Sequence, residues 1–170
     1  MTRHAGMEAG NAMAWPPEIA FLVKHGVDPQ LITAMALRAC QVAAPPDRVA
    51  VMEGFMTAQA YWSVLARELD VPFLDAAELA RQISHDHVRI PETFTTGIAV
   101  LNAQGIAVNG GENRRFVMAP EGAMVARLLA SGPGFRARIA LTSPHVLQAC
   151  VRHAAQGAIA FQAAHALPLK

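Results

Sequence analysis

The feature that most constrains the fold of this 170-residue chain is an internal repeat close to its N-terminus. A short apolar segment ends at Gly26, a longer one follows, and the same succession recurs around Gly54, 28 residues later. In this register the paired positions are Leu22 and Ala50, Val23 and Val51, Ala36 and Val64, and Leu37 and Leu65. A glycine directly after a helix adopts the left-handed conformation without strain and turns the chain back. The repeat therefore predicts two tandem hairpins, each built from a short helix, a glycine and a long helix.

Capping residues predict where these helices begin. Asp28, directly before Pro29, is typical of a helix start, and Thr57 predicts a second long helix over 58–69. We expect Asp47 to cap the short helix between them.

The hydrophobic pattern changes to that of short strands at Gly97. The sequence predicts, in order, a helix over 76–84, strands over 98–101, 106–108 and 115–118, a helix over 121–131, a strand over 136–141, and a helix from Ser143 and Pro144 to about Ala155. A strand, helix, strand succession favours parallel pairing through a right-handed crossover. We therefore predict an α+β fold, in which a helical repeat precedes a small mixed sheet of β-β-α-β-α order with helices on one face.

The chain is predicted to divide into four parts. Its apolar residues make up 53% of the sequence, enough for a packed core, and no continuous apolar run is long enough to predict direct membrane insertion. The parts are a flexible lead-in over 1–17, a helical subdomain over 18–88, an α/β subdomain over 89–157, and the start of a linker to a downstream domain over 158–170.

Charge is distributed unevenly between the two halves. Up to Thr96 there are eleven acidic and seven basic residues, and from Gly97 there are two acidic and seven basic ones, so the halves carry −4 and +5. The basic half could meet the acidic half of the same chain, which is the interpretation we favour, or an acidic partner or anionic ligand.

Motifs of the common catalytic classes are absent from the sequence. It has no phosphate-binding G-x-x-x-x-G-K-S/T loop, no G-x-G-x-x-G, no G-x-S-x-G and no H-E-x-x-H. The segment His85-Asp86-His87 is the nearest approach to a metal cluster, but alternate side chains diverge on a strand and on a helix. We predict no metal, no cofactor and no catalytic residue.

A group of arginines is the most suggestive polar set. Its members are Arg114, Arg115, Arg127, Arg136 and Arg138, and the backbone near Gly132 and Gly134 could add N–H donors for an anion. The alternative is a basic surface that serves solubility and pairs with the acidic half. Aromatic residues are few and not interleaved with these bases, which argues against nucleic acid as a partner.

The segment Leu65 to Asp75, LARELDVPFLD, resembles the L-A-x-x-L-G-x-P-F-x-D turn in the N-terminal domain of type II secretion and type IV pilus assembly ATPases. Ile90-Pro91-Glu92, the strand that begins at Arg115, and Ser143-Pro144 are similar to later segments of that domain. The resemblance implies a domain that docks onto inner-membrane partner proteins without hydrolysing ATP.

Some members of that family bind cyclic di-GMP through two tandem R-L-G-x-x-L-x-x-x-G-x6-L-x-x-A-L-x-x-Q motifs, about 29 residues apart, and the glycine repeat is similar to them. The resemblance implies ligand contacts at Leu22, Gly26, Leu37, Gly54 and Leu65. Where the motif has its opening Arg this chain has Pro17 and Pro45, and where it has its closing Gln this chain has Cys40 and Glu68.

Similar domains stand at the N-terminus of bacterial family 2 glycosyltransferases, and the alanine-rich composition here is closer to that group. We therefore expect a cytoplasmic, non-catalytic regulatory or protein-docking domain of a larger inner-membrane-associated enzyme, either a glycosyltransferase or a secretion ATPase. Its partner would be another protein or the downstream catalytic domain of the same chain. A cyclic di-GMP sensor is the alternative.

Overall fold

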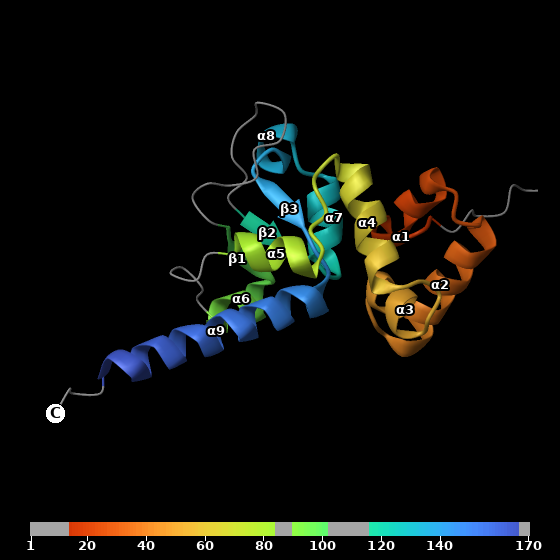
Figure 1. Cartoon of the computed structure of the whole chain (residues 1–170). Coiled ribbons are helices and arrows are strands. Elements are labelled where there is room, and N and C mark those ends of the chain that lie inside the picture. Colours follow the sequence, from red (N-terminus) through yellow and green to blue (C-terminus); the bar gives the residue numbers. More distant parts are fainter. Residues whose placement is uncertain (1–13, 84–89, 102–115, 167–170) are drawn as a thin grey trace, which may run out of the picture.

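The computed structural model describes residues 14–83, 90–101 and 116–166 (Figure 1). The predicted helical repeat is present. In its first copy α1 (Pro17–Ala20) continues into the 3-10 helix η1 (Phe21–His25) and is followed by α2 (Pro29–Val42). In its second copy α3 (Pro46–Met52) is followed by α4 (Ala58–Leu69).

Two of the predicted helix caps are confirmed. The Asp28 carboxylate accepts a hydrogen bond from the Gln30 N–H at 2.8 Å, and the Thr57 hydroxyl accepts one from the Ala60 N–H at 3.1 Å. Each cap satisfies an N–H that has no partner inside its own helix, and so fixes where the long helix begins.

The second part of the chain has the predicted β-β-α-β-α order. Two helices, α5 (Ala76–Gln82) and α6 (Ile90–Thr96), precede the sheet. The elements that follow are β1 (Ile98–Val100), β2 (Phe116–Met118), α7 (Ala123–Leu129), the single turn α8 (Pro133–Arg136), β3 (Ile139–Leu141) and α9 (Pro144–Ala166). The expected strand over 106–108 lies outside the described residues.

The sheet is mixed, as predicted. Strand β2 is central and pairs antiparallel with β1, Ala99 lying opposite Val117, and parallel with β3, Val117 lying opposite Ala140. A parallel bridge between Phe73 and Leu141 adds the segment after α4 at the outer edge of β3. Three chain segments therefore run parallel and end at the same edge of the sheet.

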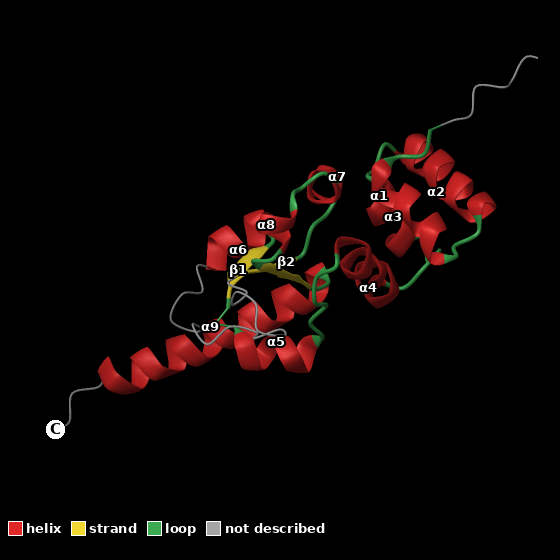
Figure 2. Cartoon of the chain, turned by 90° about the horizontal axis from the view of Figure 1, so that it is seen from above, coloured by secondary structure: helices red, strands yellow, loops and turns green. Residues whose placement is uncertain are grey.

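Helices cover both faces of the sheet, and the prediction of one covered face was wrong. Figure 2 shows the strands between α7 on one side and α5 with α9 on the other. Met118 and Leu141 belong to the core shared with α4 and α7, whereas their neighbours Val117 and Ala140 belong to the core shared with α5 and α9. All three residues of β3 are buried, because a strand covered on both faces is apolar throughout instead of alternating with polar residues.

Two boundaries differ from the sequence prediction. The strand expected over 136–141 begins only at Ile139, because Pro133 starts the helical turn α8 and Arg136 ends it. The Arg136 guanidinium donates to the Leu129 carbonyl at 2.8 Å, an acceptor left over at the end of α7. Helix α9 continues past Ala155 to Ala166, through residues expected to begin a linker. No helix in the described part of the chain combines the length and apolarity needed to cross a membrane.

The helical repeat and the sheet share one hydrophobic core. Leu65 and Leu69 of α4 pack in the same buried cluster as Val125 of α7 and Leu141 of β3, and α1 contacts α7. Two aromatic residues of α4 add buried hydrogen bonds. The Trp62 indole N–H donates to the Pro120 carbonyl at 3.0 Å, and the Tyr61 hydroxyl donates to the Glu18 carbonyl at 2.6 Å. Burial, and then the charges of Asp47 and Glu18, raise the pKa of Tyr61, so its hydroxyl stays protonated as a donor.

The sequence suggested that Asp47 caps its own helix, but it does not. The helix α3 starts at Pro46 without a side-chain cap, and Asp47 is fully buried. Its Oδ2 atom accepts a hydrogen bond from the Gly122 N–H at 2.8 Å, at the residue that precedes α7. Gly122 has φ 53° and ψ −131°, and a Cβ atom there would lie 3.4 Å from the Pro45 side chain. The contact therefore depends on a glycine at this position.

Replacing Asp47 with alanine is expected to lower the free energy of unfolding by about 2 to 4 kcal/mol, since it leaves the buried Gly122 N–H without an acceptor and opens a cavity. Asp47→Asn keeps an acceptor and should lose less. Arg48→Ala is the control, because Arg48 is exposed on the same helix and its loss should stay within about 0.5 kcal/mol. Denaturant unfolding measures all three. Equal losses for Asp47→Ala and Arg48→Ala would contradict this role.

Candidate functional site

The two repeat glycines have the geometry that the sequence predicted. Gly26 ends η1 with φ 85° and Gly54 follows α3 with φ 76°, both in the left-handed region. A Cβ atom added at either glycine would meet nothing within 4 Å, and both residues are exposed. The backbone of each turn is therefore open to an approaching molecule.

The helices of the two repeats correspond at 29 residues, whereas the glycines correspond at 28. Pro17 and Pro46 both begin short helices, and Pro29 and Ala58 both begin long ones, each pair 29 positions apart. The second copy thus has one more residue between its glycine and its long helix. The 28-residue pairing of Leu37 with Leu65 was therefore wrong for the long helices, where Leu65 corresponds to Ala36.

The predicted ligand-contacting leucines differ in exposure. Leu22 and Leu65 are fully buried in the core and have no surface to offer a ligand. Leu37 is 49% exposed on α2, although Ala66, its counterpart in the 29-residue register, is buried. Of the five repeat residues, Gly26, Gly54 and Leu37 are accessible.

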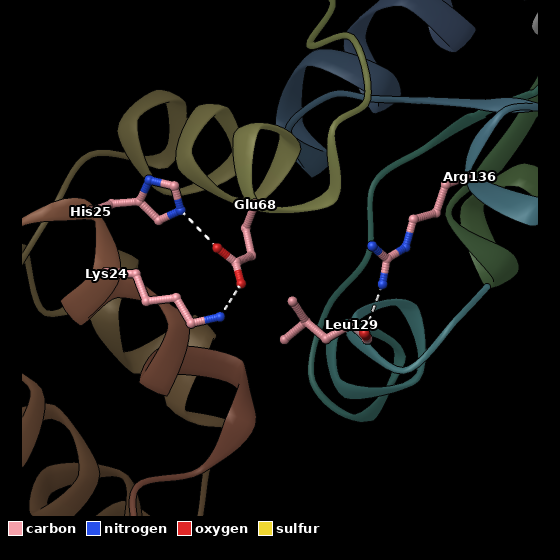
Figure 3. Close-up of polar contacts among 5 residues, drawn as sticks. All are labelled: Lys24, His25, Glu68, Leu129 and Arg136. Carbon is pink, nitrogen blue, oxygen red and sulfur yellow. Dashed lines mark hydrogen bonds and ion pairs between the residues drawn. The ribbon is translucent and has the colours of Figure 1, made fainter. Parts of the chain in front are cut away.

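Ion pairs join the end of each short helix to the long helix of the other repeat. Glu68 on α4 accepts from Lys24 Nζ at 2.6 Å and lies 2.9 Å from His25 Nε2, both at the end of η1 (Figure 3). In the reverse direction, Glu53 after α3 pairs with Arg38 on α2 at 3.0 Å. The helices themselves pack in the same reciprocal way, since η1 contacts α4 and α3 contacts α2.

Glu68 therefore has a structural partner on each side of its carboxylate. The hydrogen bond from Lys24, assisted by His25 and opposed by partial burial, lowers the pKa of Glu68 below its ordinary value. The carboxylate stays charged at neutral pH and is held by Lys24 and His25 of the first repeat. An anionic ligand at this position would have to compete with Glu68 for Lys24 and His25.

The arginine set is not assembled into one site among the described residues. Arg114 and Arg115 lie outside them. Arg136 is half-buried, and its guanidinium donates to the Leu129 carbonyl (Figure 3). It also contacts the Ser131 hydroxyl at 3.4 Å. Arg138 is exposed between α8 and β3, and Arg127 is exposed on α7. The role of Arg136 in ending α7 is one that its position in the sequence did not indicate.

Clusters suited to metal binding or catalysis are not found in the described segments. No group of three or more His, Cys, Asp or Glu side chains there could hold a metal ion, and His85, Asp86 and His87 lie outside these segments. A small pocket of about 160 Å³ lies between α6, α7 and α9 and is lined by Thr93, Glu121 and Gln148 among others. It brings no nucleophile next to a base.

The exposed large apolar residues are a feature that the sequence analysis did not single out. Met52 is 77% exposed, Leu37 49% and Val42 40%, and Phe135 (47%) and Phe94 (39%) are exposed on α8 and α6. We call Leu37, Val42 and Met52 the α2–α3 surface, since they lie on that pair of packed helices, at the end of the molecule away from the sheet and α9 (Figure 1). The Arg38–Glu53 ion pair links the two helices beside Leu37 and Met52.

Comparison with known proteins gives no assignment. No protein-family model matches the chain, and no curated protein matches it.

Replacing Glu68 with glutamine is expected to lower the free energy of unfolding by about 0.5 to 1.5 kcal/mol at pH 7, because it removes the charge that Lys24 and His25 contact. The folded-state pKa of Glu68 lies below its unfolded value. Its contribution is therefore present above the unfolded pKa and is lost as the pH falls through the folded pKa. The wild type and Glu68→Gln should converge in acid, as urea unfolding from pH 7 to pH 3 would show. Glu53→Gln should cost less, because the Glu53 side chain is more exposed than that of Glu68 and forms one ion pair. A constant difference between wild type and Glu68→Gln across the pH series would refute the ion pair.

Proposed function

We propose that this chain is a non-catalytic regulatory or protein-docking domain of a larger bacterial enzyme at the cytoplasmic side of the inner membrane. The α2–α3 surface is the observation that carries this proposal. Three exposed large apolar side chains on one packed helix pair offer a protein partner apolar area whose burial is favourable. The resemblance to secretion ATPase and glycosyltransferase N-terminal domains suggests the class of the enzyme.

The polar groups of the fold support the same proposal. Asp47, Glu68, Arg136 and Thr142 each bind a group of another element and stabilise the packing between elements. A catalytic site instead needs titratable groups that converge on a cleft where substrate can enter. These four side chains thus have structural roles, whereas the apolar α2–α3 surface has none.

Site-specific cross-linking in the native cells tests the docking proposal. A photoreactive residue placed at Met52 in the full-length protein should yield a product with an inner-membrane enzyme or with another part of the same polypeptide. Leu37→Asp should reduce its yield about tenfold, the effect expected of one central apolar contact. The same probe at Arg127, exposed on α7, is the control. No product from Met52, equal yields from both positions, or sugar transfer or ATP hydrolysis by the purified chain would overturn the proposal.

Sensing of cyclic di-GMP is the second candidate, favoured by the two exposed left-handed glycine turns at matching positions. Titration calorimetry of the purified chain tests it. Saturable heat at micromolar concentration that is lost in Gly26→Val and Gly54→Val would support sensing. Ala130→Val is the control, because Ala130 is exposed at the end of α7, outside both glycine turns. Thermal melting separates lost binding from lost folding, and an absence of heat at high ligand concentration excludes this ligand.

A further inference from the structure

A second pocket, of about 600 Å³, lies where the N-terminal ends of α4, α5 and α9 meet. Figure 1 shows these three helix ends beside one another, next to the edge at which the parallel strand segments finish. The pocket is lined by Gln59 of α4, Asp75 and Ala76 at the start of α5, Ser143 and Val146 at the start of α9, and Phe73. In sheets with parallel strands, ligands bind outside the carboxyl ends of the strands.

Two of these helices direct unused N–H groups toward the pocket region. α4 has 12 residues and α9 has 23, and the first-turn N–H groups of a helix have no partner inside it. Thr57 uses only the N–H of Ala60, so those of Ala58 and Gln59 are left without a partner among the described residues. At α9 the same holds for His145 and Val146. Such groups, with the helix dipoles behind them, favour a bound negative charge.

Ser143 is the independent observation that points to a ligand. It is only 3% exposed, it lines the pocket, and its hydroxyl forms no hydrogen bond with another described residue. Serine before a helix normally caps it, as Thr57 caps α4, but no hydrogen bond joins the Ser143 hydroxyl to the first turn of α9. The hydroxyl of this almost wholly buried side chain is therefore free to donate to an acceptor bound in the pocket.

The pocket also contains the negative charge of Asp75, opposite in sign to the helix N-termini, and apolar side chains. Asp75 uses its Oδ1 atom to cap α5 through the Glu78 N–H at 2.8 Å. Its second oxygen has no hydrogen-bond partner among the described residues and could accept from a cation. A simple anion would be repelled by this carboxylate. Phe73 and Val146 add apolar surface beside these polar groups.

We propose that this pocket binds a small apolar α-amino acid. The carboxylate of the amino acid is held by Ser143 and the N–H groups at the starts of α4 and α9, its ammonium group lies by Asp75, and its side chain contacts Phe73 and Val146. The volume of about 600 Å³ is sufficient for a ligand of this size. The inference is independent of the docking partner and gives the domain a ligand that could regulate it.

Backbone NMR of the full chain tests this proposal with a panel of L-amino acids, with L-leucine as the reference probe. Leucine should shift the amide signals of Ala58, Gln59, His145 and Val146 saturably. Leucinamide lacks the carboxylate and 4-methylpentanoate lacks the ammonium group, so both should bind at least about tenfold more weakly, the effect of about 1.4 kcal/mol. No saturable shift with any amino acid of the panel at 10 mM, about the limit of useful affinity, would overturn the proposal.

Two variants test separately the contacts to the carboxylate and to the ammonium group of the ligand. Ser143→Ala should weaken leucine and 4-methylpentanoate alike, whereas Asp75→Asn should weaken leucine only. Asparagine caps a helix as well as aspartate does, so Asp75→Asn removes the charge and keeps the start of α5. Asp28→Asn makes the same change at the cap of α2, outside the pocket, and should leave binding unchanged. Equal binding of leucine and 4-methylpentanoate, or equal effects of Asp75→Asn and Asp28→Asn, would refute the role of Asp75.

Discussion

The hydrogen bond between the buried Asp47 carboxylate and the Gly122 N–H is the interaction on which the arrangement of the two halves depends. It joins α3, in the middle of the helical repeat, to the start of α7, which covers one face of the sheet. Losing this bond would leave both the buried carboxyl group and the buried Gly122 N–H without a partner, so the contact opposes displacement of one half against the other. The Trp62 bond to Pro120, two residues before Gly122, holds the same loop from α4. The shared hydrophobic core forms around these two contacts.

Local patterns were sufficient to predict the elements, but not the contacts between them. Asp28 and Thr57 act within three residues of themselves, so their caps could be predicted from neighbouring residues alone. Asp47 was assigned to its own helix by the same rule, and its actual partner is 75 positions away, beyond any local pattern. Arg136 was likewise expected in a strand. Its actual role could not be predicted, because the Leu129 carbonyl that it binds becomes its neighbour only when α7 folds. The glycines were found at the right places, but their 28-residue offset concealed the 29-residue register of the helices.

The sequence predicted the candidate site only in part, for a similar reason. The sequence indicated the glycine turns, but a list of leucines at matching positions does not distinguish Leu37, half-exposed, from Leu65, fully buried. The single residue inserted after Gly54 pairs Leu65 with Ala36, and both are buried, but it pairs the half-exposed Leu37 with the buried Ala66. Which leucine faces the core therefore depends on the packing of each helix and not on the repeat register alone. Neither the exposure of Met52 nor the meeting of three helix ends at Ser143 leaves a motif in the sequence, since both follow from tertiary packing.

The reciprocal packing of the repeat distinguishes it from a linear array. In a solenoid each unit stacks on its neighbour, and units can be added or removed with a modest change in stability. Here each short helix contacts the long helices of both copies, and ion pairs run from each copy to the other. Removing either copy would therefore expose surfaces of the other, so the two copies form one unit and not two separable modules.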